Sequence, residues 1–159
     1  MSLTDALARM PRVALIDAPT PIQPLKHIEE MMGPALNGVR LYVKRDDLLG
    51  LGGGGNKLRK LEYLMGDAAA NGCDTIIASG GIQSNFTRVT AAACARQKIG
   101  CELVLAPLVP ETDDDYQRNG NTILNDLFGA RVQVLDRGEN PADFARRLLQ
   151  AKCREFRGK

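Results

Sequence analysis

The chain has 159 residues, 44% of them apolar and 25% charged, which is enough for one ordinary domain with a core of its own. Its 21 Lys and Arg nearly balance its 19 Asp and Glu, and no run of one charge sign predicts a nucleic-acid or membrane surface, so we expect a small-molecule partner. Four cysteines without a CxxC pair and one histidine argue against a metal site, and the lack of a secretory leader or a long apolar run predicts a cytoplasmic protein.

The first forty residues are rich in proline, in phrases such as DAPTPIQPL, which favours an extended arm over one continuous helix. The stretch 39–44, VRLYVK, is typical of a short strand. A loop with five glycines follows at 50–55, and apolar residues then recur at helical spacing from 56 to about 70, with Asn71 and Gly72 as a stop signal. The predicted order is therefore strand, glycine loop, helix.

Strands and helices continue to alternate along the rest of the chain. We expect strands at 75–79, 101–105 and 131–135, and helices at 84–98, 119–128 and 141–156. This order predicts right-handed βαβ crossovers and an α/β fold with three layers (αβα) around a parallel sheet. The last helix stands where the alternation requires another strand, so we expect an incomplete fold, the N-terminal portion of a longer enzyme.

The glycine loop partly matches two phosphate-binding motifs, and neither fits fully. The spacing GxGxxG is satisfied within 50–55, but the next strand does not end in the acidic residue that would bind a ribose, as an NAD-binding domain requires. A P-loop needs Gly before its lysine and Ser or Thr after it, whereas Asn56 and Leu58 flank Lys57. A flexible surface loop with a solvated lysine is the third reading.

Lys57 is predicted to lie in the first turn of its helix, where the helix dipole disfavours a charged ammonium, and the neighbouring charge of Lys60 acts in the same direction. A neutral amine is the nucleophile that forms an imine with a carbonyl cofactor. Lys60, one turn further along, is placed to meet a phosphate. These features favour a cofactor that is held covalently and carries a phosphate.

A second polar loop, GGIQSNFTR, follows the strand at 75–79 and again leads into a helix. Gln83, Ser84 and Asn85 gather at the start of this helix, where hydroxyl, amide and free backbone N–H groups suit an anionic carboxylate. Ordinary capping of the helix by Ser84 or Asn85 is the alternative. Because ligands gather at the carboxyl ends of parallel strands, the two loops are expected to face one site.

Four stretches carry a family resemblance that extends over essentially the whole chain: KRDDL at 44–48, GGNKLRKLE at 54–62, GIQSNFTR at 81–88 and, more weakly, NGNTILNDLFGA at 119–130. The chain resembles the pyridoxal-phosphate enzymes of fold type II, which are similar to the tryptophan synthase β subunit. Within them it resembles the branch of D-cysteine desulfhydrase and 1-aminocyclopropane-1-carboxylate deaminase. The resemblance implies pyridoxal 5'-phosphate as the cofactor.

The resemblance also implies a role for each residue of the two loops. Lys57 would hold the cofactor covalently and move the substrate α-proton, and with Ser84 it is a predicted catalytic residue. Lys60 and Asn85 would join Lys57 in binding the cofactor. Gln83, Ser84 and Asn85 would bind the substrate carboxylate.

Residues 1–60 would be the N-terminal arm and the cofactor-lysine segment of a large domain, and residues 61–159 a small α/β domain, with the remainder of the large domain absent. For the complete enzyme, taken to be a homodimer, the resemblance implies β-elimination of a small amino acid, above all D-cysteine to pyruvate, ammonia and sulfide, with an L-cysteate sulfo-lyase as a variant. The alternative enzyme is 1-aminocyclopropane-1-carboxylate deaminase. The alternative from another class is a truncated, non-catalytic fragment or interaction module.

Overall fold

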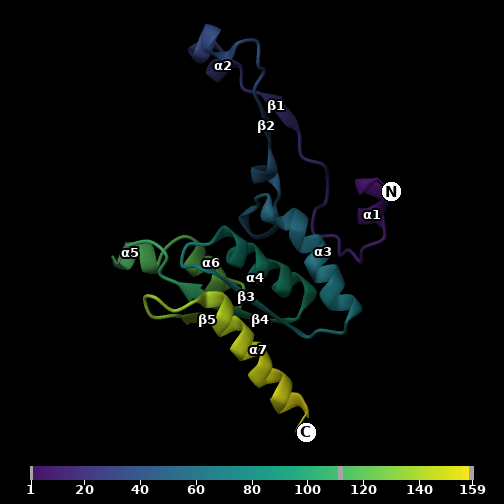
Figure 1. Cartoon of the computed structure of the whole chain (residues 1–159), viewed down its shortest axis with the longest axis vertical. Coiled ribbons are helices and arrows are strands. Elements are labelled where there is room, and N and C mark those ends of the chain that lie inside the picture. Colours follow the sequence, from purple (N-terminus) through teal and green to yellow (C-terminus); the bar gives the residue numbers. More distant parts are fainter. Residues whose placement is uncertain (1, 111–112, 158–159) are drawn as a thin grey trace.

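The computed structural model describes residues 2–110 and 113–157. After an N-terminal arm, the chain forms an α/β unit from α3 (Lys57–Ala70), β3 (Thr75–Gly81), α4 (Asn85–Gln97), β4 (Gly100–Ala106), α5 (Asp114–Gln117), α6 (Asn121–Leu127), β5 (Arg131–Val134) and α7 (Pro141–Arg157) (Figure 1). Within the described ranges three strands pair in parallel in the order β3-β4-β5, with Leu103 opposite both Ala78 and Val132. The predicted parallel sheet is confirmed.

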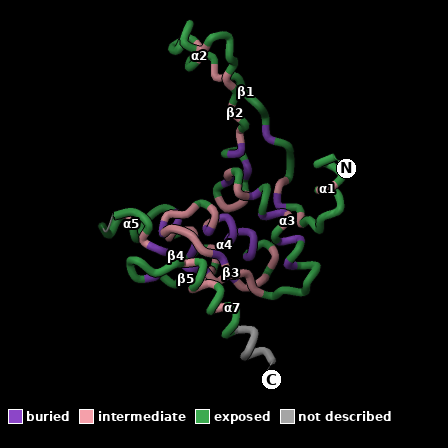
Figure 2. The backbone as a smooth tube through the Cα atoms, viewed as in Figure 1, coloured by how far each residue is buried: buried purple, intermediate pink, exposed green. Residues whose placement is uncertain are grey.

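Helices cover both faces of the parallel sheet, as the three-layer prediction requires. α4 packs on β3 and β4 and also contacts α3 and α6, whereas α7 contacts β3 and β4 from the opposite face (Figure 1). Because side chains alternate along a strand, Leu103 and Leu105 of β4 point toward α4, and Val104, which is fully buried, points toward α7. Figure 2 shows that the buried residues concentrate in this unit.

α3 forms where the apolar period predicts it and presents one side to the core. Leu58, Leu61 and Met65 are buried at spacings of three and four residues, which are the spacings of one helix face. The helix ends at Ala70 with Asn71 as its C-cap, and Gly72 follows with φ +67°, a conformation that glycine adopts without steric cost. Each such leucine contributes about 1.5–3 kcal/mol when it is removed from water.

The strand predicted at 39–44 forms as β2 (Tyr42–Lys44), and the arm also carries elements that the proline-rich sequence did not predict: α1 (Leu3–Ala8), β1 (Ile22–Pro24) and α2 (Lys26–Met32). β1 and β2 pair antiparallel and lead out to α2, so that this ribbon projects away from the α/β unit (Figure 1). Nearly all of the ribbon is exposed (Figure 2), including large apolar side chains such as Met31, which is 87% exposed.

Glu62 fastens the start of the arm to α3. Its buried carboxylate accepts hydrogen bonds from the Arg12 side chain at 2.9 and 2.5 Å and from the backbone N–H groups of Leu15 and Ile16 at 2.9 and 3.0 Å. A carboxylate that is removed from water requires such a full set of donors. Residues 12–16 of the arm are therefore anchored to α3, whereas the ribbon projects away from the α/β unit.

The predicted elements of the α/β unit are all present, with ends that shift by at most a few residues. β3 runs to Gly81 rather than residue 79, because Gly80 and Gly81 continue to pair with Leu105 and Ala106 of β4. The proposed division at residues 60 and 61 falls inside α3 and stays a prediction. No helix in the described part of the chain is long and apolar enough to cross a membrane.

Candidate active site

The glycine loop, residues 50–55, contains glycines of two kinds. A Cβ at Gly52 (φ +62°) would lie 2.6 Å from the Cβ of Ala92 in α4, and a Cβ at Gly54 (φ +71°) would lie 2.2 Å from a backbone carbonyl oxygen. These two glycines allow the loop to pack on α4 and on its own backbone. Gly55 (φ +111°) has nothing within 4 Å of its Cβ position, so the last residue of the loop borders open space.

Lys57 is the first residue of α3, as predicted. Its side chain is half-buried, and within the described ranges no hydrogen bond or ion pair engages its amine. Asn56 stands at the N-cap but its side chain caps no backbone N–H, so the positive end of the helix dipole lies beside this amine. Lys60 lies one turn further along, exposed, with its Nζ 3.9 Å from the centre of the Phe86 ring.

The second loop ends in the helix cap that the sequence suggested. Ser84 is the N-cap of α4, and its Oγ accepts a hydrogen bond from the backbone N–H of Thr87 at 3.4 Å. The capping reading is therefore confirmed for Ser84, whose hydroxyl hydrogen remains available to a ligand. Asn85 is the first residue of α4 and is exposed.

Gln83 is held by the segment that leads into α6. Its Nε2 donates to the carbonyl oxygens of Tyr116 at 2.6 Å and Asn119 at 2.8 Å, and its Oε1 accepts from the backbone N–H of Asn121 at 2.9 Å. Both ends of the amide are thus engaged within the protein. Contact of Gln83 with a substrate stays a prediction, as do the ligand roles of the other four residues.

Arg88 of α4 joins the two predicted loops. Its guanidinium donates to the carbonyl oxygen of Gly54 at 2.9 Å and to Oδ1 of Asn121 at 3.1 Å. The contact between Lys60 and Phe86 links the same two segments. Arg88 and Asn121 were not predicted as site residues, although both stand inside the stretches that carry the family resemblance, and that position was the available signal.

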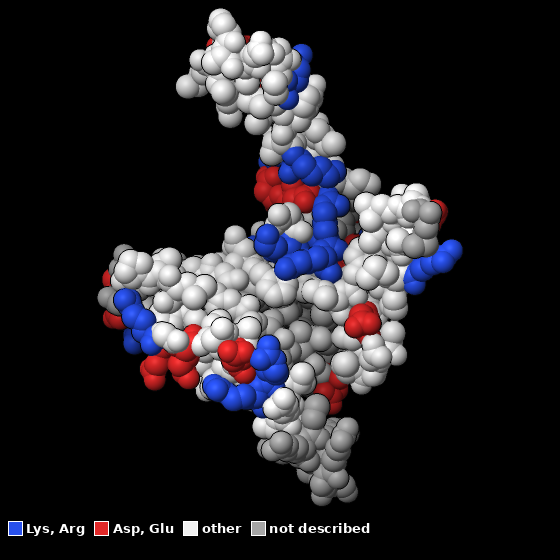
Figure 3. Space-filling model, viewed as in Figure 1, with Lys and Arg blue, Asp and Glu red and all other residues white. Residues whose placement is uncertain are grey.

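Positive side chains gather where the arm meets the α/β unit (Figure 3). Arg59 of α3 donates to both carboxylate oxygens of Asp46, at 2.6 and 2.8 Å, and Thr20 donates to the same carboxylate at 2.8 Å. The hydrogen bonds from Arg59 lower the pKa of Asp46 from 3.8 to about 2, against the opposing effect of burial. Asp46 therefore stays ionised and fixes the turn before the glycine loop, whose Gly55 N–H donates to the Asp46 carbonyl oxygen.

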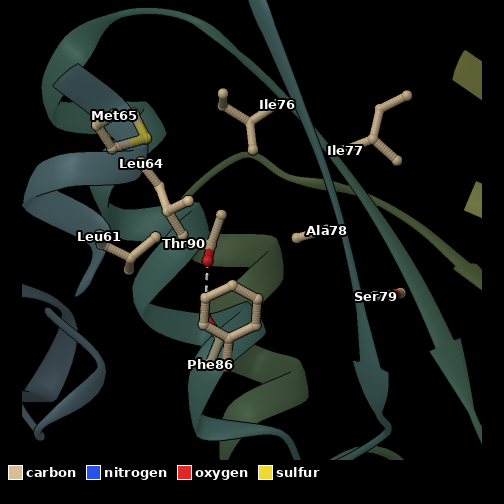
Figure 4. A pocket seen from close by; sticks show the side chains of 9 residues that line it. All are labelled: Leu61, Leu64, Met65, Ile76, Ile77, Ala78, Ser79, Phe86 and Thr90. Atoms are coloured by element: carbon tan, nitrogen blue, oxygen red, sulfur yellow. Dashed lines mark hydrogen bonds between the residues drawn. The ribbon is translucent and has the colours of Figure 1, made fainter. Parts of the chain in front are cut away.

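An apolar pocket of about 330 Å³ lies between α3, β3 and α4 (Figure 4). Leu61, Leu64 and Met65 line it from α3, and the side chains of Phe86 and Thr90 line it from α4. Its remaining walls come from residues 76–79 of β3. None of the five predicted site residues lines this pocket, so it adjoins the candidate site through Phe86 without being part of it.

The family model for pyridoxal-phosphate dependent enzymes matches residues 13–157, so the chain belongs to that family. Its relatives include the D-cysteine desulfhydrases of Salmonella paratyphi B and Salmonella newport, each 42% identical over 135 residues, which are 85% of this chain and 40% of the relative. The chain therefore spans less than half the length of these relatives.

Solved structures match the fold of the chain. A crystal structure of an ACC deaminase homologue superposes with a TM-score of 0.81 at 36% identity, over 98% of this chain and 45% of the other. A hydrogen sulfide-producing enzyme from Fusobacterium nucleatum reaches 0.55 at 15% identity, over 86% and 39%, which shows the fold alone. The predicted fold type II and the family's dependence on pyridoxal phosphate are confirmed.

The described residues fit this cofactor. Lys57 offers an amine without a hydrogen-bond partner in the described ranges, Lys60 and the start of α3 offer positive charge for a phosphate, and Ser84 and Asn85 offer donors at the start of α4. No group of His, Cys, Asp and Glu within the described residues could hold a metal ion. The arrangement suits a planar, anionic, carbonyl-bearing ligand.

Proposed function

We propose that the chain supplies the lysine-bearing part of a pyridoxal-phosphate dependent carbon–sulfur lyase that converts D-cysteine and water to pyruvate, ammonia and hydrogen sulfide. The observation that carries this proposal is the amine of Lys57 at the start of α3, which no described residue engages, in a chain 42% identical to D-cysteine desulfhydrases over 85% of its length. Because the match covers 40% of those relatives, the activity is proposed for a protein of their length. We further propose that this protein is cytoplasmic and a homodimer.

In the proposed reaction each site residue has a separate task. Lys57 holds the cofactor and takes the proton from the substrate Cα, while Lys60 holds the cofactor phosphate. Ser84 and Asn85 bind the substrate carboxylate, with Asn85 also near a cofactor oxygen, and Gln83 supports them. When bound, the cofactor stabilises negative charge at Cα, which allows the thiol at Cβ to leave.

The domain division belongs to the same proposal. Residues 1–60 form the arm and the cofactor-lysine segment of a large domain, and residues 61–159 form the small domain. The arm supports this division because its ribbon exposes large apolar side chains, such as Ile22 and Tyr42, which a larger domain would cover.

Two other functions remain open to test. The structural likeness to an ACC deaminase homologue favours a deaminase as the alternative enzyme. It would release 2-oxobutanoate and ammonia from a cyclopropane amino acid and no sulfide. A non-catalytic module is the alternative from another class, and it would form no covalent adduct with the cofactor.

The first test is covalent attachment of pyridoxal phosphate to Lys57. The protein is mixed with the cofactor, its imine absorbance is recorded, and the linkage is reduced with borohydride and mapped by mass spectrometry. We expect the adduct on Lys57 in the wild type and its loss in Lys57→Ala. Lys26→Ala is the matched control, because Lys26 is likewise the first residue of a helix but lies exposed on α2.

An adduct that persists in Lys57→Ala would show that another lysine anchors the cofactor. Sulfide release from D-cysteine then separates the two enzymes, because only the desulfhydrase produces it. A wild-type protein that forms no adduct and releases no sulfide would favour the non-catalytic module.

A further inference from the structure

Asn121, the first residue of α6, lies behind the loop that carries Gln83, Ser84 and Asn85. It is 9% exposed, and both ends of its amide are hydrogen-bonded. Its Oδ1 accepts from Arg88 at 3.1 Å, and its Nδ2 donates to the carbonyl oxygen of Gln83 at 2.8 Å and to Oδ1 of Asn85 at 3.1 Å. One buried side chain thus connects α4, α6 and the predicted ligand loop.

The partners fix which way each amide is turned. A guanidinium can only donate, so the atom of Asn121 that faces Arg88 must be its oxygen. A backbone carbonyl oxygen can only accept, so the atom that faces Gln83 must be the nitrogen of Asn121. That same nitrogen faces Asn85 and requires an acceptor there. The Asn85 oxygen therefore points inward, and its NH₂ group points away from Asn121.

We propose that Asn121 is a positioning residue, which turns the NH₂ group of Asn85 outward as a hydrogen-bond donor for an anionic oxygen bound at the start of α4. The proposal rests on the proposed function, because that oxygen belongs either to the cofactor or to the substrate carboxylate. Within the described ranges Arg88 pairs with no carboxylate, so its positive charge adds to the attraction for an anion.

The test is Asn121→Asp, which keeps the shape of the side chain and replaces its donating NH₂ group with an accepting oxygen. Arg88 still meets an oxygen, but Asn85 and the Gln83 carbonyl now also face an oxygen. Asn85 must then turn its NH₂ group inward and present its oxygen to the anion. The Gln83 carbonyl oxygen loses its donor, but the new carboxylate pairs with Arg88 and agrees with the helix dipole, so we expect the variant to fold with some loss of stability.

The orientation of Asn85 can be read without any ligand. ¹⁵N NMR follows hydrogen exchange of its side-chain NH₂ group, which we expect to slow in Asn121→Asp because the group becomes an internal donor. An unchanged exchange rate would overturn the proposal whether or not the cofactor binds.

With ligand, we expect Asn121→Asp to raise the apparent Kd for pyridoxal phosphate, or the KM for D-cysteine at saturating cofactor, by about tenfold or more. The first result assigns the anionic oxygen to the cofactor and the second to the substrate. In an Asn85→Ala background the same change should cause a smaller loss, because the residue through which it acts is gone and only the effect of the new carboxylate beside Arg88 remains. Equal losses in both backgrounds would overturn the proposal that Asn121 acts through Asn85.

Asn140→Asp is the matched control, since Asn140 also stands at a helix start, capping α7 through its Oδ1, and is exposed. It should leave both constants and the exchange of Asn85 unchanged. Failure of the proposed function is a separate result: the wild type would then form no Lys57 adduct, while the NMR measurement would still decide the orientation of Asn85.

Discussion

Single residues in this chain divide into those that a local pattern reveals and those that only the folded chain reveals. The positions of Lys57 and Ser84 at helix starts could be predicted, because neighbouring residues carry the signals of a helix start. Arg88 and Asn121 could not be given their roles, because their contacts join residues 33 to 38 positions apart. Their side-chain types fit a solvated helix surface equally well, so the sequence offered no local reason to choose.

Asp46 leads to a prediction about pH. Its pKa is lowered to about 2, below the ordinary 3.8, so it stabilises the folded state fully above pH 3.8, and this contribution is lost as the pH falls toward 2. In urea unfolding, Asp46→Asn should therefore be less stable than the wild type near neutral pH, by about 1–3 kcal/mol, and the gap should narrow in acid.

Asp47→Asn is the control for this experiment, because Asp47 pairs with Arg45 at an exposed position and its loss should cost less. A gap between the wild type and Asp46→Asn that stays constant from neutral to acid pH would contradict the assignment. It would mean that the stability lost in Asp46→Asn does not come from the ionised carboxylate that Arg59 and Thr20 contact.

At the scale of elements, apolar spacing predicted α3, α4 and β4, whose apolar side chains are buried in the core. The arm could not be predicted in the same way. β2 was expected from the β-branched and aromatic residues of 39–44, but β1 is only three residues long and α2 buries no residue, so neither β1 nor α2 carries a periodic apolar signal. α5, four residues long, was also missed.

The glycine loop gives a prediction about backbone conformation. Gly54→Ala places a side chain at φ +71° and against a carbonyl oxygen, so we expect it to lower the free energy of unfolding by at least about 1–2 kcal/mol. Gly50→Ala is the internal control, since Gly50 has φ −74° and open space around it. Chemical denaturation of both variants measures the difference, and equal stabilities would show that the loop rearranges without cost.

For the molecule as a whole, the cysteines can report on global unfolding. Cys94 of α4 and Cys101 of β4 are buried in the main core, where the hydrogen bond to Cys94 and burial both raise the pKa of Cys101, whereas Cys73 is exposed. We expect a thiol reagent to modify Cys73 quickly, and Cys94 and Cys101 only as fast as the whole unit unfolds. Mass spectrometry of the labelled peptides measures each rate. Rapid labelling of Cys94 under native conditions would show that α4 opens locally.

The position of α7 has a consequence for the strand that carries the candidate site. α4 and α6 connect successive strands on one face of the sheet. After β5 the chain passes to the opposite face, where α7 lies and contacts β3 and β4. By the right-handed crossover rule, a parallel strand that follows α7 would pair with the outer edge of β3. The apolar pocket of Figure 4 borders that edge, with β3 residues from both of its faces. In such a sheet the strand order reverses beside β3, and the loop from Gln83 to Asn85 would stand at the topological switch point, where open α/β sheets form their ligand crevice.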